Sequence, residues 1–399
     1  MSLRLSKRVG RISPSITLEI TAKVRAMQAA GHDVIGFGAG EPDFDTPEPI
    51  KEAAVRALAE GFTKYTPVGG IPELKAAIVE KFARENDLAY SPEEILVSCG
   101  AKHCLYNLFQ ACLAAGDEVL VPAPYWVSYP EMVALADATP IVVPPVDDGS
   151  FKISPDALRE RITPRSRALI INSPSNPTGA AYTEEELRAL AEVAEEADLL
   201  IVSDEIYERI VYDGFRPVSP AALSDEIKAR TMVVNGLSKT FSMTGWRLGY
   251  IAGDKSIVTA MTTIQSQSTS NPTSFAQRGA VEALRVPLEE VAAMVSEFAR
   301  RRDVMVKGLG AADGFRCSTP QGAFYVFPDV SGLFGRRYKE TELKGSVDVA
   351  AFLLDEAMVA VIPGLDFGDD RCVRLSYATS LENIEEGLAR IGKAVSNLG

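Results

Sequence analysis

Histidine is scarce in this 399-residue chain, which has only two, His32 and His103. So few imidazoles argue against a histidine-rich metal site and against a Ser-His-Asp triad. The P-loop pattern G-x-x-x-x-G-K-[ST] and the dinucleotide-binding pattern G-x-G-x-x-G are both absent. We therefore look elsewhere than in the common nucleotide-binding motifs for the chemistry of the chain.

Cysteine is also sparse, with five scattered residues and no C-x-x-C spacing. An odd number without such spacing indicates neither a disulfide framework nor a zinc site. The basic N-terminal segment lacks the apolar stretch of a signal peptide, and no apolar run is long enough to span a bilayer. We expect reduced thiols in a cytoplasmic protein.

Positive charge is not in excess, because 54 Asp and Glu outnumber 41 Lys and Arg and give a net charge of -13. This balance argues against nucleic acid or an anionic membrane as a partner. A small anionic substrate stays possible, since a few arginines can set the sign of the charge inside one pocket. At 399 residues the chain is long enough for two domains.

Short apolar runs alternate with helical patterns through the middle of the chain. Such runs are typical of a mostly parallel sheet with helices on both faces, which is an α/β fold. Ligands of these sheets bind beyond the carboxyl ends of the strands. The predicted strands cover residues 95–98, 118–121, 141–143, 168–172, 199–203, 232–234 and 248–252.

The pattern changes after a long helix predicted at 287–309, where short strands indicate a smaller α+β unit. A closing helix is predicted from Ser380, its N-cap. The opening residues precede the alternating region, so we expect them to pack with the C-terminal unit. We therefore predict three parts: 1–46 as an N-terminal arm and part of the small domain, 47–290 as the large domain, and 291–399 as the small C-terminal domain.

The segment TMVVNGLSKTFSMTGWRLGY, residues 231–250, holds the first candidate for chemistry. A buried strand is predicted at its start, then a tight turn at Asn235-Gly236, then Lys239 between two hydroxyl residues. Desolvation near the core lowers the pKa of a lysine and makes its amine a nucleophile. A lone lysine here would ordinarily be a surface residue that caps a strand.

Two polar residues follow neighbouring predicted strands. Asp204 ends an apolar strand and is costly to bury unless it meets a cation or a strong donor. It could cap a turn, or it could face a pyridine nitrogen and keep that ring protonated while Lys239 forms a Schiff base. Asn176, in SPSNPTG, either makes a turn or holds a phenolic ring oxygen, to which Tyr207 could also donate.

A phosphate site is predicted where Gly100-Ala101-Lys102 opens a helix, because a helix N-terminus presents unpaired N-H groups. Ser238 and Arg247 could complete this site with a hydroxyl and a guanidinium.

Two further side chains have a functional and a structural interpretation. Trp126 could stack on a flat ring or pack at the edge of the core. Arg374 alternates with apolar residues on a predicted strand, where it could bind a substrate carboxylate bidentately or form a structural salt bridge.

Taken together, LSKTFSMTGWRLGY (237–250), SDEIYE, SPSNPTG, GAGEPDFDTP, YTPVGGIPELK, PYWVSYPEM and VRLSYATS resemble the class I aminotransferases. These are fold-type-I enzymes that use pyridoxal 5′-phosphate, and the likeness runs in order from about Leu5 to the C-terminus. The resemblance implies a Schiff base between the cofactor and Lys239, with Asp204 at the pyridine nitrogen.

The resemblance also assigns the remaining contacts of the cofactor and substrate. Tyr207 and Asn176 would hold the ring oxygen, and Trp126 would stack on the ring. Arg374 would bind the α-carboxylate with the Gly40 backbone and Asn176. The phosphate would be held by Ser238, Arg247, Gly100, Ala101 and Lys102.

A tyrosine that matches Tyr65 reaches the phosphate of the neighbouring subunit in this family, which implies a homodimer with shared sites. The likeness is strongest to an aspartate aminotransferase branch in which residues matching Thr17 and Lys102 hold the second carboxylate. Some enzymes of that branch accept prephenate. Two departures are Gly236, where some relatives have serine, and His103, which follows Ala101-Lys102 where Gly-Lys-Gln is more usual.

The expected reaction moves the amino group of L-aspartate to 2-oxoglutarate by a ping-pong mechanism. Prephenate, aromatic or alanine transamination is the alternative, followed by another fold-type-I activity such as a β-lyase or an aminocyclopropane-forming synthase. A regulator that senses pyridoxal phosphate would need an added DNA-binding segment, which we do not expect in this acidic chain.

Overall fold

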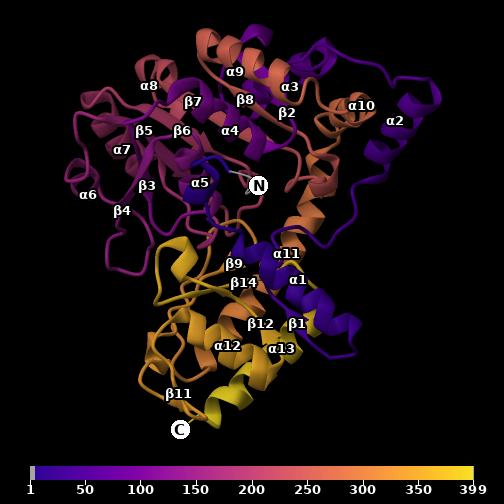
Figure 1. The fold of residues 1–399 in the computed structure, drawn as a ribbon. Helices are drawn as coiled ribbons and strands as arrows, with labels where there is room; N and C mark the ends of the chain where they lie inside the picture. The colour runs from indigo at the N-terminus through magenta and orange to yellow at the C-terminus, as the bar shows by residue number, and fades with distance from the viewer. Residues whose placement is uncertain (1–4, 399) are drawn as a thin grey trace, which may run out of the picture.

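The computed structural model describes residues 5–398; residues 1–4 and 399, and the side chains of residues 288 and 290, lie outside the description. Two lobes are visible, one around a large sheet and one around α12 and α13 (Figure 1). The N-terminal segment lies with the second lobe, where strand β1 (Ile35–Gly36) pairs with β12 (Val359–Ala360). The boundaries at 46/47 and 290/291 stay a prediction.

The large sheet has seven strands in the order β2-β8-β7-β6-β5-β3-β4. All neighbouring pairs are parallel except those of β8, which is antiparallel to both β2 and β7. The predicted mostly parallel sheet is confirmed. The strands are β2 (Ile95–Ser98), β3 (Glu118–Pro122), β4 (Thr139–Val143), β5 (Ser166–Asn172), β6 (Leu200–Asp204), β7 (Thr231–Gly236) and β8 (Gly249–Ala252).

Successive residues of β5 show why the strands are continuous apolar runs. Ile170 packs in a cluster with Leu105 and Phe109 of α4, on one face of the sheet. Leu169 and Ile171 pack on the opposite face. Because side chains alternate along a strand, a sheet with helices on both faces needs apolar residues at every position.

The long helix predicted at 287–309 is observed as α11 (Leu288–Ala311), and the closing helix is observed as α13 (Leu381–Ser396). Ser380 is the N-cap of the last helix, as predicted, and its hydroxyl accepts a hydrogen bond from the Asn383 N-H. The helices are α1 (Ile16–Ala29), α2 (Glu48–Ala59), α3 (Pro72–Glu85), α4 (Ala101–Cys112), α5 (Ser128–Leu135), α6 (Pro155–Arg159), α7 (Glu184–Glu196), α8 (Asp225–Ala229), α9 (Lys255–Ser268), α10 (Ser274–Ala283), α11 (Leu288–Ala311), α12 (Ser346–Ala357) and α13 (Leu381–Ser396).

The second lobe is built on short strands, of which β13, β14 and β9 form an antiparallel sheet. The long helix α11 runs from the first lobe into the second (Figure 1). No helix within residues 5–398 is long and apolar enough to cross a membrane. Besides β1 and β12, the strands of this lobe are β9 (Tyr325–Val326), β10 (Arg337–Tyr338), β11 (Thr341–Glu342), β13 (Ile362–Pro363) and β14 (Val373–Ser376).

One local prediction is wrong, because Asn235-Gly236 is not a turn. Strand β7 continues through both residues, and Gly236 pairs with Gly249 of β8. A Cβ atom on Gly236 would lie 3.2 Å from the Gly249 Cα, so glycine permits this close strand pairing. The chain leaves the sheet only after Gly236, and Lys239 follows in the loop.

Candidate active site

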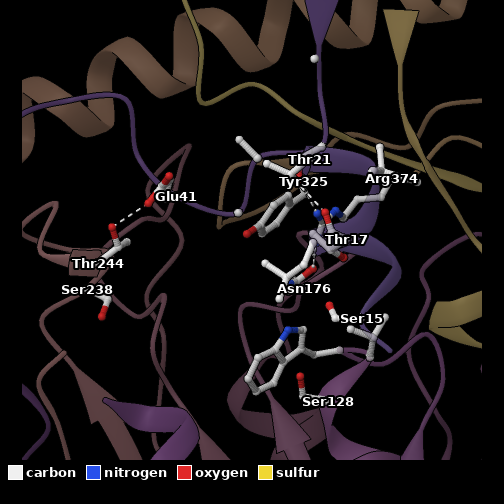
Figure 2. Close-up of a pocket in the computed structure, with 18 of the residues that line it drawn as sticks. Ser15, Thr17, Thr21, Glu41, Ser128, Asn176, Ser238, Thr244, Tyr325 and Arg374 are labelled. Carbon is white, nitrogen blue, oxygen red and sulfur yellow. Dashed lines mark hydrogen bonds between the residues drawn. The ribbon is translucent and has the colours of Figure 1, made fainter. Parts of the chain in front are cut away.

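A cavity of about 1070 Å³ opens at the carboxyl ends of β5 and β6, between the two lobes. Helix α1, the loop after β1 and strand β14 bring residues from both ends of the chain to it (Figure 2). Of the predicted site residues, all but Gly100 and Tyr65 line it. These are Thr17, Gly40, Ala101, Lys102, Trp126, Asn176, Asp204, Tyr207, Ser238, Lys239, Arg247 and Arg374.

The Lys239 amine lies inside this cavity and donates a hydrogen bond to the Gly40 carbonyl. The aromatic rings of Tyr207 and Phe324 lie 6.0 and 5.7 Å from its Nζ. Burial lowers the pKa of Lys239 to about 8, although the nearby Glu41 carboxylate opposes this shift. Roughly a tenth of the amine is therefore neutral and nucleophilic at about pH 7, far more than for an ordinary lysine.

Asp204 ends β6 with its side chain almost completely buried. Its Oδ2 accepts a 2.6 Å hydrogen bond from the Tyr129 hydroxyl, and its Oδ1 accepts one of 3.3 Å from the Ile206 N-H. Burial raises the pKa of Asp204 to about 6 in spite of these donors. A cation placed against this carboxylate would be strongly favoured, because it would lower that pKa again.

Two hydrogen-bonded pairs hold the next polar groups at the strand ends. The Asn172 side chain accepts from the Asn176 N-H at 2.9 Å and donates to the Asp204 carbonyl at 2.9 Å. The Tyr207 and Tyr325 hydroxyls are 2.9 Å apart. Asn176 and Tyr207 are thus fixed on the cavity wall by groups from separate elements.

The turn at Gly100 has the geometry of an anion site. Gly100 has φ 95° and precedes the first residue of α4, so backbone N-H groups of the helix start point toward the cavity. Arg247 lies against this turn and donates to the Thr244 carbonyl at 2.9 Å and the Cys99 carbonyl at 3.2 Å. A Cβ atom on Gly100 would meet the Arg247 Nη2 at 2.6 Å, so glycine is needed here.

Arg374 is almost completely buried on β14, with its guanidinium over the rings of Tyr325 and Phe367. It donates to Asn176 Oδ1 and to the Gly38 carbonyl, each at 2.9 Å. Its Nε has no hydrogen-bond partner, and no carboxylate of residues 5–398 pairs with it. The structural alternative, a salt bridge within the protein, is therefore not observed among these residues, and a buried cation of this kind can bind an anionic ligand.

A second cation, Lys102, lines the same cavity, and its Nζ is 4.8 Å from the centre of the Trp126 ring. Burial, followed by repulsion from Arg247, lowers the pKa of Lys102. Thr17, in the first turn of α1, lines the same cavity near Asn176 and Arg374 (Figure 2). The cavity can therefore receive a molecule with more than one anionic group.

Three positions singled out from the sequence lie apart from the cavity wall. The Tyr65 side chain is 91% exposed. The His103 Nδ1 accepts a 3.3 Å hydrogen bond from the Cys99 N-H, and burial lowers its pKa. Gly236 is packed against Ile206 and Gly249, which leaves little room for the serine of some relatives.

Sequence reasoning missed Tyr129, Tyr325 and Glu41. Tyr129 and Tyr325 support Asp204 and Tyr207, and Glu41 lines the cavity beside Thr244. Tyr129 stands three residues after Trp126 in PYWVSYPEM, so helical spacing was an available signal. Nothing in the local sequence marks Tyr325, because it reaches the site from the other lobe.

The residues present fit pyridoxal 5′-phosphate. A buried carboxylate that lacks a cation can face the ring nitrogen, a partly neutral lysine can bind the aldehyde, and a helix start with Arg247 and Ser238 can bind the phosphate.

Comparison with known proteins agrees with this fit. The family model described as "Aminotransferase class I and II" matches residues 32–391. The chain is 52% identical over 396 residues to an aspartate aminotransferase of Bacillus subtilis, covering 98% of this chain and 99% of that protein. It is 50% identical to a probable aspartate/prephenate aminotransferase of Aquifex aeolicus, with 99% of each covered.

Solved structures are equally similar. An aspartate aminotransferase of Rhizobium meliloti superposes with a TM-score of 0.97 at 45% identity, covering 100% of both chains. The aspartate aminotransferase of Thermus thermophilus, solved with maleate, superposes with a TM-score of 0.92 at 46% identity. The match covers 98% of this chain and 100% of that one.

The chain belongs to the class I and II aminotransferase family. It is an aminotransferase that depends on pyridoxal 5′-phosphate, and its substrates are amino acids and 2-oxo acids. The predicted class, fold and cofactor are confirmed.

Proposed function

We propose that this enzyme transfers the amino group of L-aspartate to 2-oxoglutarate, giving oxaloacetate and L-glutamate. The observation that carries the proposal is the buried Arg374 guanidinium, which has no carboxylate partner among the described residues, in one cavity with a second cation, Lys102. Two separated cations suit a dicarboxylate. The names of the Bacillus subtilis and Thermus thermophilus relatives support the same substrate.

The site residues would hold the cofactor as follows. Asp204 would meet the pyridine nitrogen, supported by Tyr129, and Asn176 and Tyr207 would hold the ring oxygen. Trp126 would stack on the ring. The phosphate would be bound by Gly100, Ala101, Lys102, Ser238 and Arg247, with Tyr65 reaching it from a second subunit.

When bound, the cofactor supplies an aldehyde that links to amines and a protonated ring that accepts the electron pair of Cα. The chain must then bind, orient and move protons. Arg374 would hold the α-carboxylate of the amino acid, aided by Asn176 and the Gly40 backbone. Thr17 and Lys102 would hold the side-chain carboxylate.

Lys239 would act as a general base when it takes the proton from Cα of the substrate. It would act as a general acid when it donates that proton again. Its pKa near 8 suits both roles at neutral pH. Burial of the amine beside the Tyr207 and Phe324 rings excludes water from this transfer. Each oxo acid leaves before the next substrate binds, so initial rates should follow a ping-pong pattern.

The test is steady-state kinetics on the purified enzyme. With L-aspartate and 2-oxoglutarate, we expect oxaloacetate and glutamate in equal amounts and parallel double-reciprocal lines. A higher kcat/KM with prephenate as acceptor would shift the assignment to that larger dicarboxylate, which the name of the Aquifex aeolicus relative also mentions. Release of ammonia or pyruvate in place of transfer would move the enzyme to the lyases.

We also infer a cytoplasmic homodimer with shared sites and the domain division 1–46, 47–290 and 291–399. The exposed apolar side chains of Tyr65, Val55 and Leu58 support an interface around α2. All five cysteines are free thiols, which suits a reducing compartment. Light scattering gives the mass, and mixing Tyr65→Phe with Lys239→Ala subunits tests whether activity depends on residues from two chains.

A further inference from the structure

The loop of residues 38–46, between β1 and α2, crosses the cavity and touches three functional groups in succession. The Gly38 carbonyl accepts from Arg374, and the Gly40 carbonyl accepts from the Lys239 amine. Next along the loop, the Glu41 Oε2 accepts a 2.7 Å hydrogen bond from the Thr244 hydroxyl. Figure 2 shows Glu41 and Thr244 facing each other near Ser238, away from Arg374.

The partner of Glu41, Thr244, contacts a residue of the predicted phosphate site, Arg247. Thr244 begins the short 3-10 helix 244–246, and its carbonyl accepts from Arg247 at 2.9 Å. The Glu41–Thr244 hydrogen bond therefore ties the loop that covers Lys239 to the segment that holds Arg247. The far end of the loop is tied separately, by the Thr46 hydroxyl to the Ser242 carbonyl at 2.7 Å.

The charges that face the Lys239 amine come from four other elements of the chain. Arg374 and Arg247 repel its proton, whereas Glu41 and Asp204 attract it, and Glu41 has a larger effect than Asp204. Asp204 is itself occupied by Tyr129 and by burial that favours its neutral form. The Glu41 carboxylate is thus the main counter-charge to the lysine amine.

We propose that Glu41 is a positioning residue that fastens loop 38–46 over Lys239 and keeps a negative charge beside its amine. This inference rests on the proposed role of Lys239 in the reaction. Glu41 has no assigned contact with the substrate or cofactor. It acts through its effect on the Lys239 amine and through its hydrogen bond to Thr244. Its carboxylate offsets part of the effect of Arg374 and Arg247, which repel the proton of the lysine amine.

Removing the charge should lower the pKa of Lys239 further. We expect Glu41→Gln to lower it by at least about 0.5 unit, since the Glu41 carboxylate favours the protonated form of the amine. Thr244→Val keeps the carboxylate but frees the loop, so we expect a smaller shift in the same direction. Glu48→Gln is the matched control, because Glu48 is exposed on α2 and pairs with Lys51.

The experiment is a pH titration by NMR of the cofactor-free, full-length protein with its lysines ¹³C-methylated. Lys239 and Lys102 signals are assigned with arginine variants, and circular dichroism confirms that each variant is folded. Lys102 is an internal reference, because its pKa depends on burial and Arg247 and not on Glu41.

A lowered Lys239 pKa in Glu41→Gln, with Lys102 and Glu48→Gln unchanged, supports the proposal. Equal Lys239 pKa values in Glu41→Gln, Glu48→Gln and the parent protein overturn it. If the Lys239 pKa shifts in Glu41→Gln but not in Thr244→Val, the proposed fastening of the loop is overturned. Only the effect of the Glu41 charge on the amine is then supported. The readout needs no catalysis, so a failure here is distinct from a failure of the proposed reaction, which Lys239→Ala tests.

Discussion

Two adjacent carboxyl groups at the end of β6, Asp204 and Glu205, are equally buried but lie in different regions of the molecule. Asp204 lines the cavity, whereas Glu205 points into the protein and accepts from the Ser203 and Ser219 hydroxyls at 2.7 and 2.6 Å. Burial raises the pKa of Asp204 to about 6 and that of Glu205 to about 7. A raised pKa alone therefore does not tell a functional carboxyl group from a structural one. Of the two, Asp204 lines the cavity and can reach a ligand there.

The cations of the two regions differ in the same way. On the core side, buried Lys81 forms an ion pair with Glu208, and both side chains also bond to Asn86. On the cavity side, Arg374 has no carboxylate partner within the described part of the chain. The core cation is thus neutralised within the protein, whereas the cavity cation is available to an anionic ligand.

The largest expected effect separates the two carboxyl groups. Asp204→Asn should lower kcat/KM for L-aspartate by about 10³, or about 4 kcal/mol, because an amide cannot keep the pyridine nitrogen protonated. Glu205→Gln should stay within about threefold of the parent enzyme, since Glu205 does not reach the cavity. Initial rates with both variants check this, and similar losses in the two would contradict the comparison.

The next prediction concerns the cations. Lys81→Met should cost about 3 kcal/mol of unfolding free energy, because it leaves Glu208 buried without its partner, and should leave KM unchanged. Arg374→Lys should raise KM for amino acids by about 10² with little loss of stability, since lysine cannot bind a carboxylate bidentately. Urea unfolding and steady-state kinetics on each variant distinguish these outcomes; an effect of Lys81→Met on KM would argue against separate roles.

The pH dependence of stability tests the core carboxyl group alone. The folded-state pKa of Glu205 is raised from 4.5 to about 7, so its protonated form stabilises the fold. That contribution is complete below about pH 4.5 and is lost as the pH rises through about 7. Glu205→Gln should therefore be about 2 kcal/mol more stable than the parent at pH 8 and equal to it at pH 5. Equal stabilities at both pH values would be evidence against the buried neutral acid.

The smallest expected effect is on substrate choice. Lys102→Met should lower kcat/KM for L-aspartate about tenfold more than for L-alanine, which is about 1.4 kcal/mol, because only aspartate has a second carboxylate for this amine. Glu48→Gln is again the control. Equal losses for both amino acids would indicate that Lys102 serves the phosphate or the fold instead.

The sequence was informative where function and local pattern coincide. Asp204, Asn176 and Lys239 follow apolar strands, so the rule that ligands bind at the carboxyl ends of parallel strands was enough to bring them together. Arg374 was identifiable as an arginine among apolar residues on a strand.

Contacts between distant segments could not be predicted in this way. Tyr325 reaches Tyr207 from the second lobe, and Glu41 meets Thr244 across 203 positions of sequence. Such pairs depend on how the lobes pack, which no periodicity records. The predicted turn at Asn235-Gly236 failed for a related reason. Here a strong local turn signal was present, but strand pairing with Gly249 overrides it.

The most direct test of the account is a single-turnover absorbance scan of the cofactor-loaded enzyme with L-aspartate, L-alanine or L-phenylalanine, for the parent and for Lys239→Ala. We predict that L-aspartate converts the cofactor from its aldehyde form to its amine form at least about tenfold faster than the other two, and that Lys239→Ala slows this conversion by about 10⁴ or more. Undiminished conversion by Lys239→Ala would contradict the central role of this lysine.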